Sequence, residues 1–165
     1  MITDVGEFIV GAYLKLELDC DVVDYNVRPP GGGLSGLGEL DVVGLDFQND
    51  TAYLCEVTTH IRGFRYGTHQ ETIKRIKKKH RRQRNYAKKY LTNFNHQHFM
   101  FWSPYVPRGY LTENLAKINT LELVINGDYK KAIEKLRARA GKEKQDSGNP
   151  FFRTLQILEN LKDWT

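Results

Sequence analysis

The sequence contains only two cysteines, Cys20 and Cys55, among 165 residues. A disulfide framework normally needs more, and neither cysteine has a partner at zinc-finger spacing, so we expect both to be reduced and Cys55 to pack within a strand. No apolar run approaches the ~20 residues that a membrane-spanning helix needs. The first residues, Met1 to Asp4, lack the basic and apolar segments of a signal peptide. These absences predict a cytoplasmic protein that does not enter a membrane.

Glycine and proline are concentrated in one segment, Pro29 to Gly38. Gly31, Gly33 and Gly36 match the dinucleotide-binding pattern G-x-G-x-x-G, but that pattern requires a helix directly after the loop. The next segment has the composition of a strand instead. We therefore interpret the segment as a flexible loop of the kind that often closes over a substrate.

Positive charge is concentrated in a second segment. The chain carries a net charge of +5, yet residues 70–92 alone contain ten Lys or Arg and one acidic residue. This window is therefore at +9 and the rest of the chain at −4. Such local charge favours a polyanion as partner, although a solvated helix face has the same appearance. A membrane surface is disfavoured because the window lacks a strong apolar face.

Hydrophobic periodicity and turn residues divide the chain into ten elements. We expect helices at 4–18, with Thr3 as N-cap, and at 69–92, 111–118, 128–140 and 150–163, and strands at 21–28, 39–47, 51–60, 97–103 and 121–126. Helices before and after a β-meander, followed by βαβ crossovers, predict an α/β fold with a central mixed sheet flanked by helices. The length fits a single domain, residues 1–165.

Two acidic residues stand in otherwise apolar strands, Asp41 in the second and Glu56 in the third. Side chains alternate between the faces of a strand, so a hairpin of these two strands can place both carboxylates side by side on one face. Buried carboxylates are costly unless something satisfies them. A hard cation such as Mg²⁺ would do so. The alternative is that both acids lie on a solvated face of the hairpin.

The segments Gly-Glu-Leu-Asp-Val-Val (38–43) and Glu-Val-Thr (56–58) resemble the motifs of the PD-(D/E)XK nuclease superfamily. That superfamily includes archaeal Holliday junction resolvases, Mrr-type restriction enzymes and YraN-like predicted endonucleases. The element order is similar to its restriction-endonuclease-like αβββαβ core. The resemblance covers about residues 4–103, and residues 104–165 would form a C-terminal α/β extension.

The resemblance implies a metal site and roles for particular residues. Asp41, Glu56 and the main-chain carbonyl of Val57 would bind Mg²⁺, with Mn²⁺ as a substitute. Glu7 in the first helix would contact the metal through water. Gln83, in the long basic helix, would either help to order the site or tether a loop.

One position departs from the superfamily pattern. The motif has a lysine two residues after the glutamate, and this sequence has Thr58. Threonine can hydrogen-bond the attacking water but supplies no positive charge. We expect another cation to reach the site, and the candidates are Arg62, Lys79 and Arg82.

The resulting prediction is a Mg²⁺-dependent endonuclease that hydrolyses phosphodiester bonds in nucleic acid, in DNA rather than RNA. The basic helix would bind the phosphate backbone, which gives affinity and salt dependence but little sequence information. The candidate phosphate-binding residues are Lys74, Lys77, Lys78, Arg81, Arg82, Arg84 and Lys88.

Three alternatives stay open at this point. Thr58 favours a catalytically weak or inactive nucleic-acid-binding protein on the same fold. The amphipathic C-terminal helix, with Leu158, Leu161 and Trp164, could form the seam of a homodimer. A zinc site could combine His96 and His98 with His60 or His69, although no third ligand has convincing spacing.

Overall fold

The computed structural model describes residues 2–31, 38–62 and 66–162. The elements along the chain are α1 (Val5–Leu16), β1 (Val22–Val27), β2 (Leu40–Asp46), β3 (Thr51–Val57), α2 (His69–Tyr90), β4 (His96–Ser103), α3 (Tyr110–Ala116), β5 (Leu121–Ile125), α4 (Gly127–Lys142) and α5 (Pro150–Leu161). The predicted order is confirmed, and the ends of the elements differ from the predicted ones by at most three residues.

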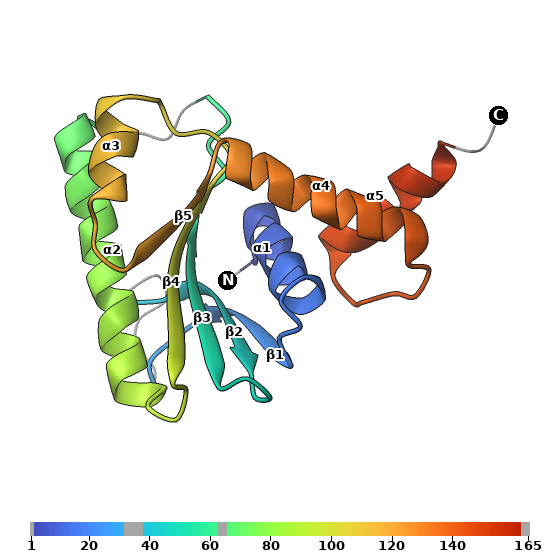
Figure 1. Ribbon diagram of the computed structural model, residues 1–165, viewed down its shortest axis with the longest axis horizontal. Coiled ribbons are helices and arrows are strands. Elements are labelled where there is room, and N and C mark those ends of the chain that lie inside the picture. Colours follow the sequence, from blue (N-terminus) through green and yellow to red (C-terminus); the bar gives the residue numbers. More distant parts are fainter. Residues whose placement is uncertain (1, 32–37, 63–65, 163–165) are drawn as a thin grey trace.

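The five strands form one mixed sheet in the order β1-β2-β3-β4-β5. The pairs β1–β2 and β2–β3 are antiparallel, and the pairs β3–β4 and β4–β5 are parallel. Helices α2 and α3 cover one face of the sheet, and α1 and α4 cover the other (Figure 1). The predicted α/β class with a central mixed sheet is therefore confirmed.

The C-terminal helices share a core with the first half of the chain. Tyr129 and Ala132 of α4 pack in one cluster with Val10 of α1 and Trp102 of β4. Helix α5 packs on α1 and α4 through Phe152 and Leu155. The exposed end of α5 carries Ile157, Leu158 and Leu161, and its use as a dimer seam stays a prediction. Trp164 lies outside the described residues.

Helix α1 begins one residue later than predicted. Its N-cap is Asp4 and not Thr3, because the Asp4 carboxylate accepts the Gly6 N–H while the Glu7 carboxylate accepts the Asp4 N–H. This reciprocal capping box satisfies two amide groups that the first turn would otherwise leave unpaired.

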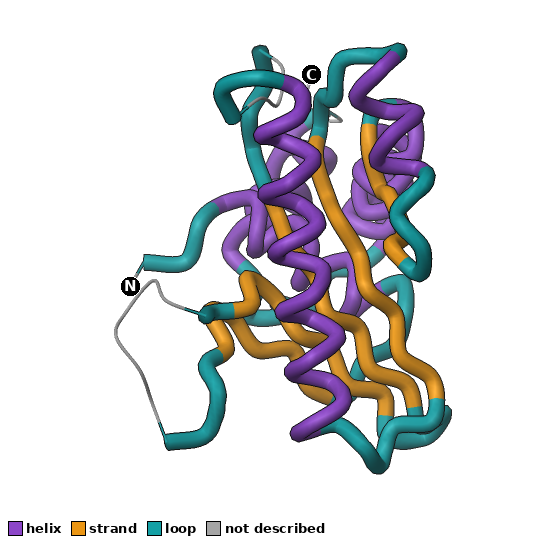
Figure 2. Tube along the Cα trace, turned by 90° about the vertical axis from the view of Figure 1, so that its left-hand side faces the viewer, coloured by secondary structure: helices purple, strands orange, loops and turns teal. Residues whose placement is uncertain are grey.

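Helix α2 has one buried side and an otherwise polar surface. Thr68 caps its N-terminus in a capping box with Glu71. The buried side contains Thr72, Ile73, Ile76, His80, Gln83 and Ala87. Tyr90, at the C-terminal end of the helix, is half-buried. In Figure 2, α2 lies in front of the sheet with its outward face uncovered.

Both cysteines are free and Cys55 is buried in β3, as expected from the sequence, and Cys20 is buried as well. Within the described part of the chain, no helix has both the length and the apolar character that crossing a bilayer requires.

Candidate functional site

Asp41 and Glu56 lie on the same face of the sheet. The antiparallel register pairs Val42 with Cys55, and directly opposite residues point to the same side, so Asp41 stands opposite Glu56. Both side chains face α2. The side chain of Glu56 is only 3% exposed, and that of Asp41 is 20% exposed. Asp41 Oδ2 accepts a 2.7 Å hydrogen bond from the main-chain N–H of Val57. The sequence expectation that the two acids share a face therefore agrees with the strand pairing.

Two cations from α2 reach these carboxylates. Lys79 Nζ lies 2.6 Å from Glu56 Oε2 and 3.9 Å from Asp41 Oδ2. Arg82 Nη2 lies 2.7 Å from Glu56 Oε1. Residues three apart on a helix point to the same side, so Lys79 and Arg82 reach the site together. The two acidic and two basic side chains form a compact network.

The environment shifts the proton affinities of this network. Burial, together with the nearby Glu56 carboxylate, raises the pKa of Asp41 from 3.8 to about 7. Burial lowers the pKa of Lys79, but the carboxylates of Glu56 and Asp41 outweigh this effect and raise it above its ordinary value. Lys79 is therefore protonated at neutral pH, while Asp41 is poised between its charged and neutral forms.

Thr58 extends β3 beyond Glu56 and has an unsatisfied hydroxyl group. Its main-chain N–H donates to Trp102 O at 3.0 Å, which continues the ladder with β4. Its side chain is buried, and among the described residues its Oγ1 has no hydrogen-bond partner. A buried hydroxyl group costs free energy unless it is paired. Alternation along the strand places this hydroxyl on the face of Glu56, where a water molecule or a phosphate oxygen would satisfy it.

The residues present fit a Mg²⁺ ion better than a metal held entirely by protein groups. The described residues contain no cluster of three His, Cys, Asp or Glu that could hold a metal. Mg²⁺ commonly keeps several water ligands and uses one or two carboxylates together with substrate phosphates. Asp41 and Glu56 supply two such carboxylates, and both oxygens of Glu56 are paired with Lys79 and Arg82 in this structure. A cation would also favour the ionised form of Asp41, whose pKa is raised mainly by burial and further by the Glu56 carboxylate.

Glu7 is engaged away from this pair in the contacts that the structure shows. Its Oε2 accepts the Asp4 N–H at 3.0 Å and the Asn26 side-chain amide at 3.3 Å. Burial is the main cause that raises the pKa of Glu7. The carboxylate serves the capping box of α1, and no contact supports its predicted role as a water-mediated metal ligand.

Gln83 is completely buried and tethers α2 to the sheet. Its amide nitrogen donates to Leu54 O at 2.9 Å and to Met100 O at 3.0 Å, which are main-chain groups of β3 and β4. Its Oε1 lies 3.3 Å from His80 Nδ1. The expected tether is therefore present, but it holds the helix to two strands and not to a loop, and no contact links Gln83 to the two carboxylates.

Two further sequence predictions concern Arg62 and the glycine loop. Arg62 is exposed after β3, and no contact links it to the carboxylates. The glycine loop lies mostly outside the described residues, which omit 32–37. At the base of that loop, Arg28 Nε lies 2.6 Å from Glu39 Oε1.

The basic residues of α2 occupy different sides of the helix. At 100° per residue, Lys79 and Arg82 lie on one flank of the buried stripe, and Lys74, Lys77 and Arg81 lie on the other. Lys74, Lys77, Lys78, Arg81, Arg84 and Lys88 are exposed, as a phosphate-binding role requires. Arg82 differs from them, because it is half-buried and paired with Glu56.

Three of the four histidines considered for zinc, His60, His69 and His98, contact other side chains. His98 Nδ1 lies 2.6 Å from Glu122 Oε1, and its ring stacks on Tyr53. His69 stacks on Tyr110, and His60 contacts Tyr66 edge-on. These pairings, together with the absence of any three-ligand cluster in the described ranges, do not support a zinc site.

Comparisons with known proteins identify no relative. No family model matches the chain, and neither the curated proteins nor the solved structures contain a significant match. The resemblance to PD-(D/E)XK nucleases therefore rests on the motif residues and the element order alone.

Proposed function

We propose that this chain is a Mg²⁺-dependent nuclease of PD-(D/E)XK type that hydrolyses phosphodiester bonds in DNA. One observation carries the proposal: two carboxylates from neighbouring strands meet a lysine in a buried site. Lys79 Nζ lies 2.6 Å from Glu56 and 3.9 Å from Asp41. A titratable group with a strongly shifted pKa beside a defined charge partner is typical of functional sites, and Asp41 has both features.

The residues would divide the chemistry among them. Asp41, Glu56 and the Val57 carbonyl would hold Mg²⁺. When bound, the ion supplies positive charge to the phosphate and lowers the pKa of a water ligand. The unpaired Thr58 hydroxyl would hold and orient a water molecule beside the two acids.

Lys79 would replace the lysine that the motif lacks at position 58. It comes from α2 and not from β3, yet its ammonium group faces both acidic residues. From this place it can orient the attacking water and stabilise the negative charge that grows on the phosphate in the transition state. Arg82 holds the other oxygen of Glu56 and so fixes the orientation of that carboxylate.

The test compares cleavage by three site variants. With plasmid DNA, single-stranded DNA and RNA as substrates and Mg²⁺ or Mn²⁺ present, we expect Asp41→Asn and Glu56→Gln to abolish cleavage. Lys79→Met removes one preorganised donor, and the expected loss is about 10²- to 10³-fold. Lys135→Met, on α4 at the opposite face of the sheet, is the matched control and should cleave like the wild type.

The circular dichroism spectrum of each variant establishes that its fold is retained. Wild-type rates in folded Asp41→Asn or Glu56→Gln would refute the assignment of the carboxylates. Wild-type rates in folded Lys79→Met would refute the lysine assignment alone.

A nucleic-acid-binding protein without catalytic activity is the second candidate. Each Glu56 oxygen already has a cationic partner, so the demand for a metal ion is partly met by the chain itself. Binding of nucleic acid without cleavage in either metal would favour this candidate.

A further inference from the structure

Helices α2 and α3 enclose a groove that the carboxylate site does not use. It has a volume of about 740 Å³ and is lined by residues of α2 together with Tyr110 and Asn114 of α3. This size is within the range of small-ligand pockets. Lys74, Lys77 and Arg81 on one flank of α2 line the groove. Arg75 on the other flank also lines it, whereas Lys79 and Arg82 do not.

The rim of the groove is strongly cationic. Lys74, Lys77, Lys78 and Arg81 line it and are exposed, and in the part of the chain that the structure describes none of the four forms a salt bridge. The single acidic residue in the lining, Glu71, accepts the Thr68 N–H in the capping box of α2. The excess positive charge in the groove is therefore available to an anionic ligand.

The groove also contains an aromatic platform and an apolar floor. Tyr110 is 51% exposed, and His69 stacks against its ring with ring centroids 6.0 Å apart and an interplanar angle of 19°. Ile73 lies beneath the groove and is 8% exposed. Phosphate alone would not need such a floor, but a flat base would pack against it.

We propose that this groove binds a single-stranded segment of nucleic acid, with an unpaired base on Tyr110 and the adjoining phosphates on Lys74, Lys77 and Arg81. A cationic groove with an exposed ring is how proteins bind single strands, since every base has a face that can stack. A duplex keeps its bases paired and stacked and would offer the groove only its backbone. The choice of nucleic acid as ligand rests on the proposed function, but the groove does not need the carboxylate pair for binding.

The test measures affinity in EDTA, so that hydrolysis cannot contribute. A fluorescent oligothymidylate and a duplex of the same length are titrated with wild-type protein and variants, and anisotropy reports binding. Tyr110→Ala should weaken oligothymidylate binding about 10-fold or more, because stacking on one base accounts for a loss of this size. Tyr110→Phe should retain the wild-type affinity, and the double variant Lys74→Gln, Lys77→Gln should weaken binding of the strand.

Tyr105→Ala is the matched control. Tyr105 is 49% exposed, close to the value for Tyr110, but it lies before α3 and does not line the groove. The Tyr105→Ala variant should bind oligothymidylate with the affinity of the wild type. Equal affinities of Tyr110→Ala and the wild type would overturn the inference. So would an equal loss in Tyr105→Ala, a parallel loss of duplex binding in Tyr110→Ala, or displacement of the strand by polyglutamate at the same charge concentration.

This result is independent of the nuclease proposal. Loss of oligothymidylate binding in Tyr110→Ala supports the groove as the binding site, even if the wild-type protein cleaves no nucleic acid. Conversely, if Tyr110→Ala binds oligothymidylate with wild-type affinity, the groove is not the binding site, even if Asp41→Asn abolishes cleavage.

Discussion

Asp41 is the residue of the proposed site whose pKa is most clearly changed by burial. Its carboxyl group is largely withdrawn from water and stands beside Glu56, and these two causes raise its pKa to about 7. In the unfolded chain, its pKa returns to about 3.8. Between these two values the folded protein binds a proton that the unfolded chain has released. The contribution of Asp41 to stability is therefore largest at low pH and falls as the pH rises through this window.

Replacement of Asp41 by asparagine should remove that pH dependence. The asparagine carbonyl can still accept the Val57 N–H, and no charge then has to be buried. In EDTA at pH 8 we expect Asp41→Asn to be more stable than the wild type by about 1–2 kcal/mol, a part of the roughly 1.4 kcal/mol per pKa unit that linkage allows. Urea unfolding at several pH values measures this difference. Parallel stability profiles of the two proteins would contradict the environment assigned to Asp41.

At the scale of elements, α2 connects every candidate site of the molecule. Its buried stripe packs on the sheet, one flank sends Lys79 and Arg82 to the carboxylates, and the other flank lines the groove beside α3. The angle at which α2 is rotated about its axis decides which cation reaches which site. Gln83 fixes that rotation, because one side-chain amide bonds the main chains of two neighbouring strands.

Gln83→Leu should therefore act on the whole element. The substitution keeps a similar volume but removes the two hydrogen bonds that the Gln83 amide donates to the Leu54 and Met100 carbonyls. Each lost hydrogen bond costs about 0.5–1.5 kcal/mol, so the midpoint of urea unfolding should fall accordingly. Asn85→Leu, at an exposed position of the same helix, is the control and should unfold like the wild type. A Gln83→Leu protein of unchanged stability would show that the amide is not a structural tether.

The sequence predicted the elements and the carboxylate pair because both follow from local periodicity. Alternation along β2 and β3 is sufficient to place Asp41 and Glu56 on one face once the strands form a hairpin. For the cation that pairs with these carboxylates, the sequence left three candidates, Arg62, Lys79 and Arg82. The choice among them depends on how α2 is rotated on the sheet. The role of Glu7 was expected from a resemblance, whereas its carboxylate is used three residues away in a helix cap. Tyr110 gave no signal in the sequence, because its groove exists only when α3 packs beside α2.

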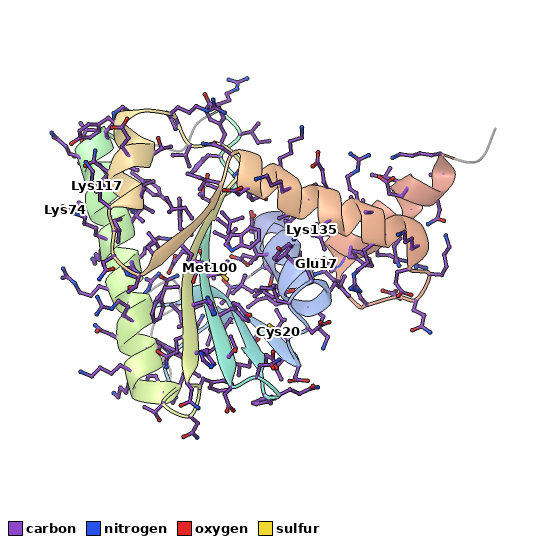
Figure 3. The ribbon with its side chains drawn as sticks, viewed as in Figure 1. Glu17, Cys20, Lys74, Met100, Lys117 and Lys135 are labelled. Atoms are coloured by element: carbon purple, nitrogen blue, oxygen red, sulfur yellow. The ribbon has the colours of Figure 1, made fainter. Side chains whose placement is uncertain are left out.

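At the scale of the whole molecule, the densest positive charge of the sequence lies on the side of the sheet that α2 covers. Lys74 projects from α2 on one side of the sheet, and Lys135 lies on α4 on the other (Figure 3). Residues 70–92, most of which form α2, contain ten Lys or Arg and one acidic residue. The rest of the chain has a net negative charge. A polyanion that approaches the molecule is therefore directed to α2.

The basic surface continues past the groove toward the end of α2. A second pocket of about 510 Å³ shares Arg81 with the groove and adds Arg84 and Lys88. A single strand of nucleic acid bound along both pockets would release a counterion from each phosphate that these cations contact. Affinity should then fall with salt at a slope of about −0.7 for each contact, which is roughly −3.5 for Lys74, Lys77, Arg81, Arg84 and Lys88 together.

Neutralising the two distal cations tests the length of this surface. In the double variant Arg84→Gln, Lys88→Gln, the magnitude of the slope of log affinity against log salt concentration for oligothymidylate should decrease by about 1.4, because two phosphate contacts are lost. The pair Lys135→Gln, Lys142→Gln on α4 removes the same charge from the opposite side and should leave the slope near that of the wild type, since charges beyond one Debye length are screened. An equal decrease in both double variants would mean that net charge, and not a track along α2, governs binding. An unchanged slope in the α2 variant would confine the strand to the groove beside α3.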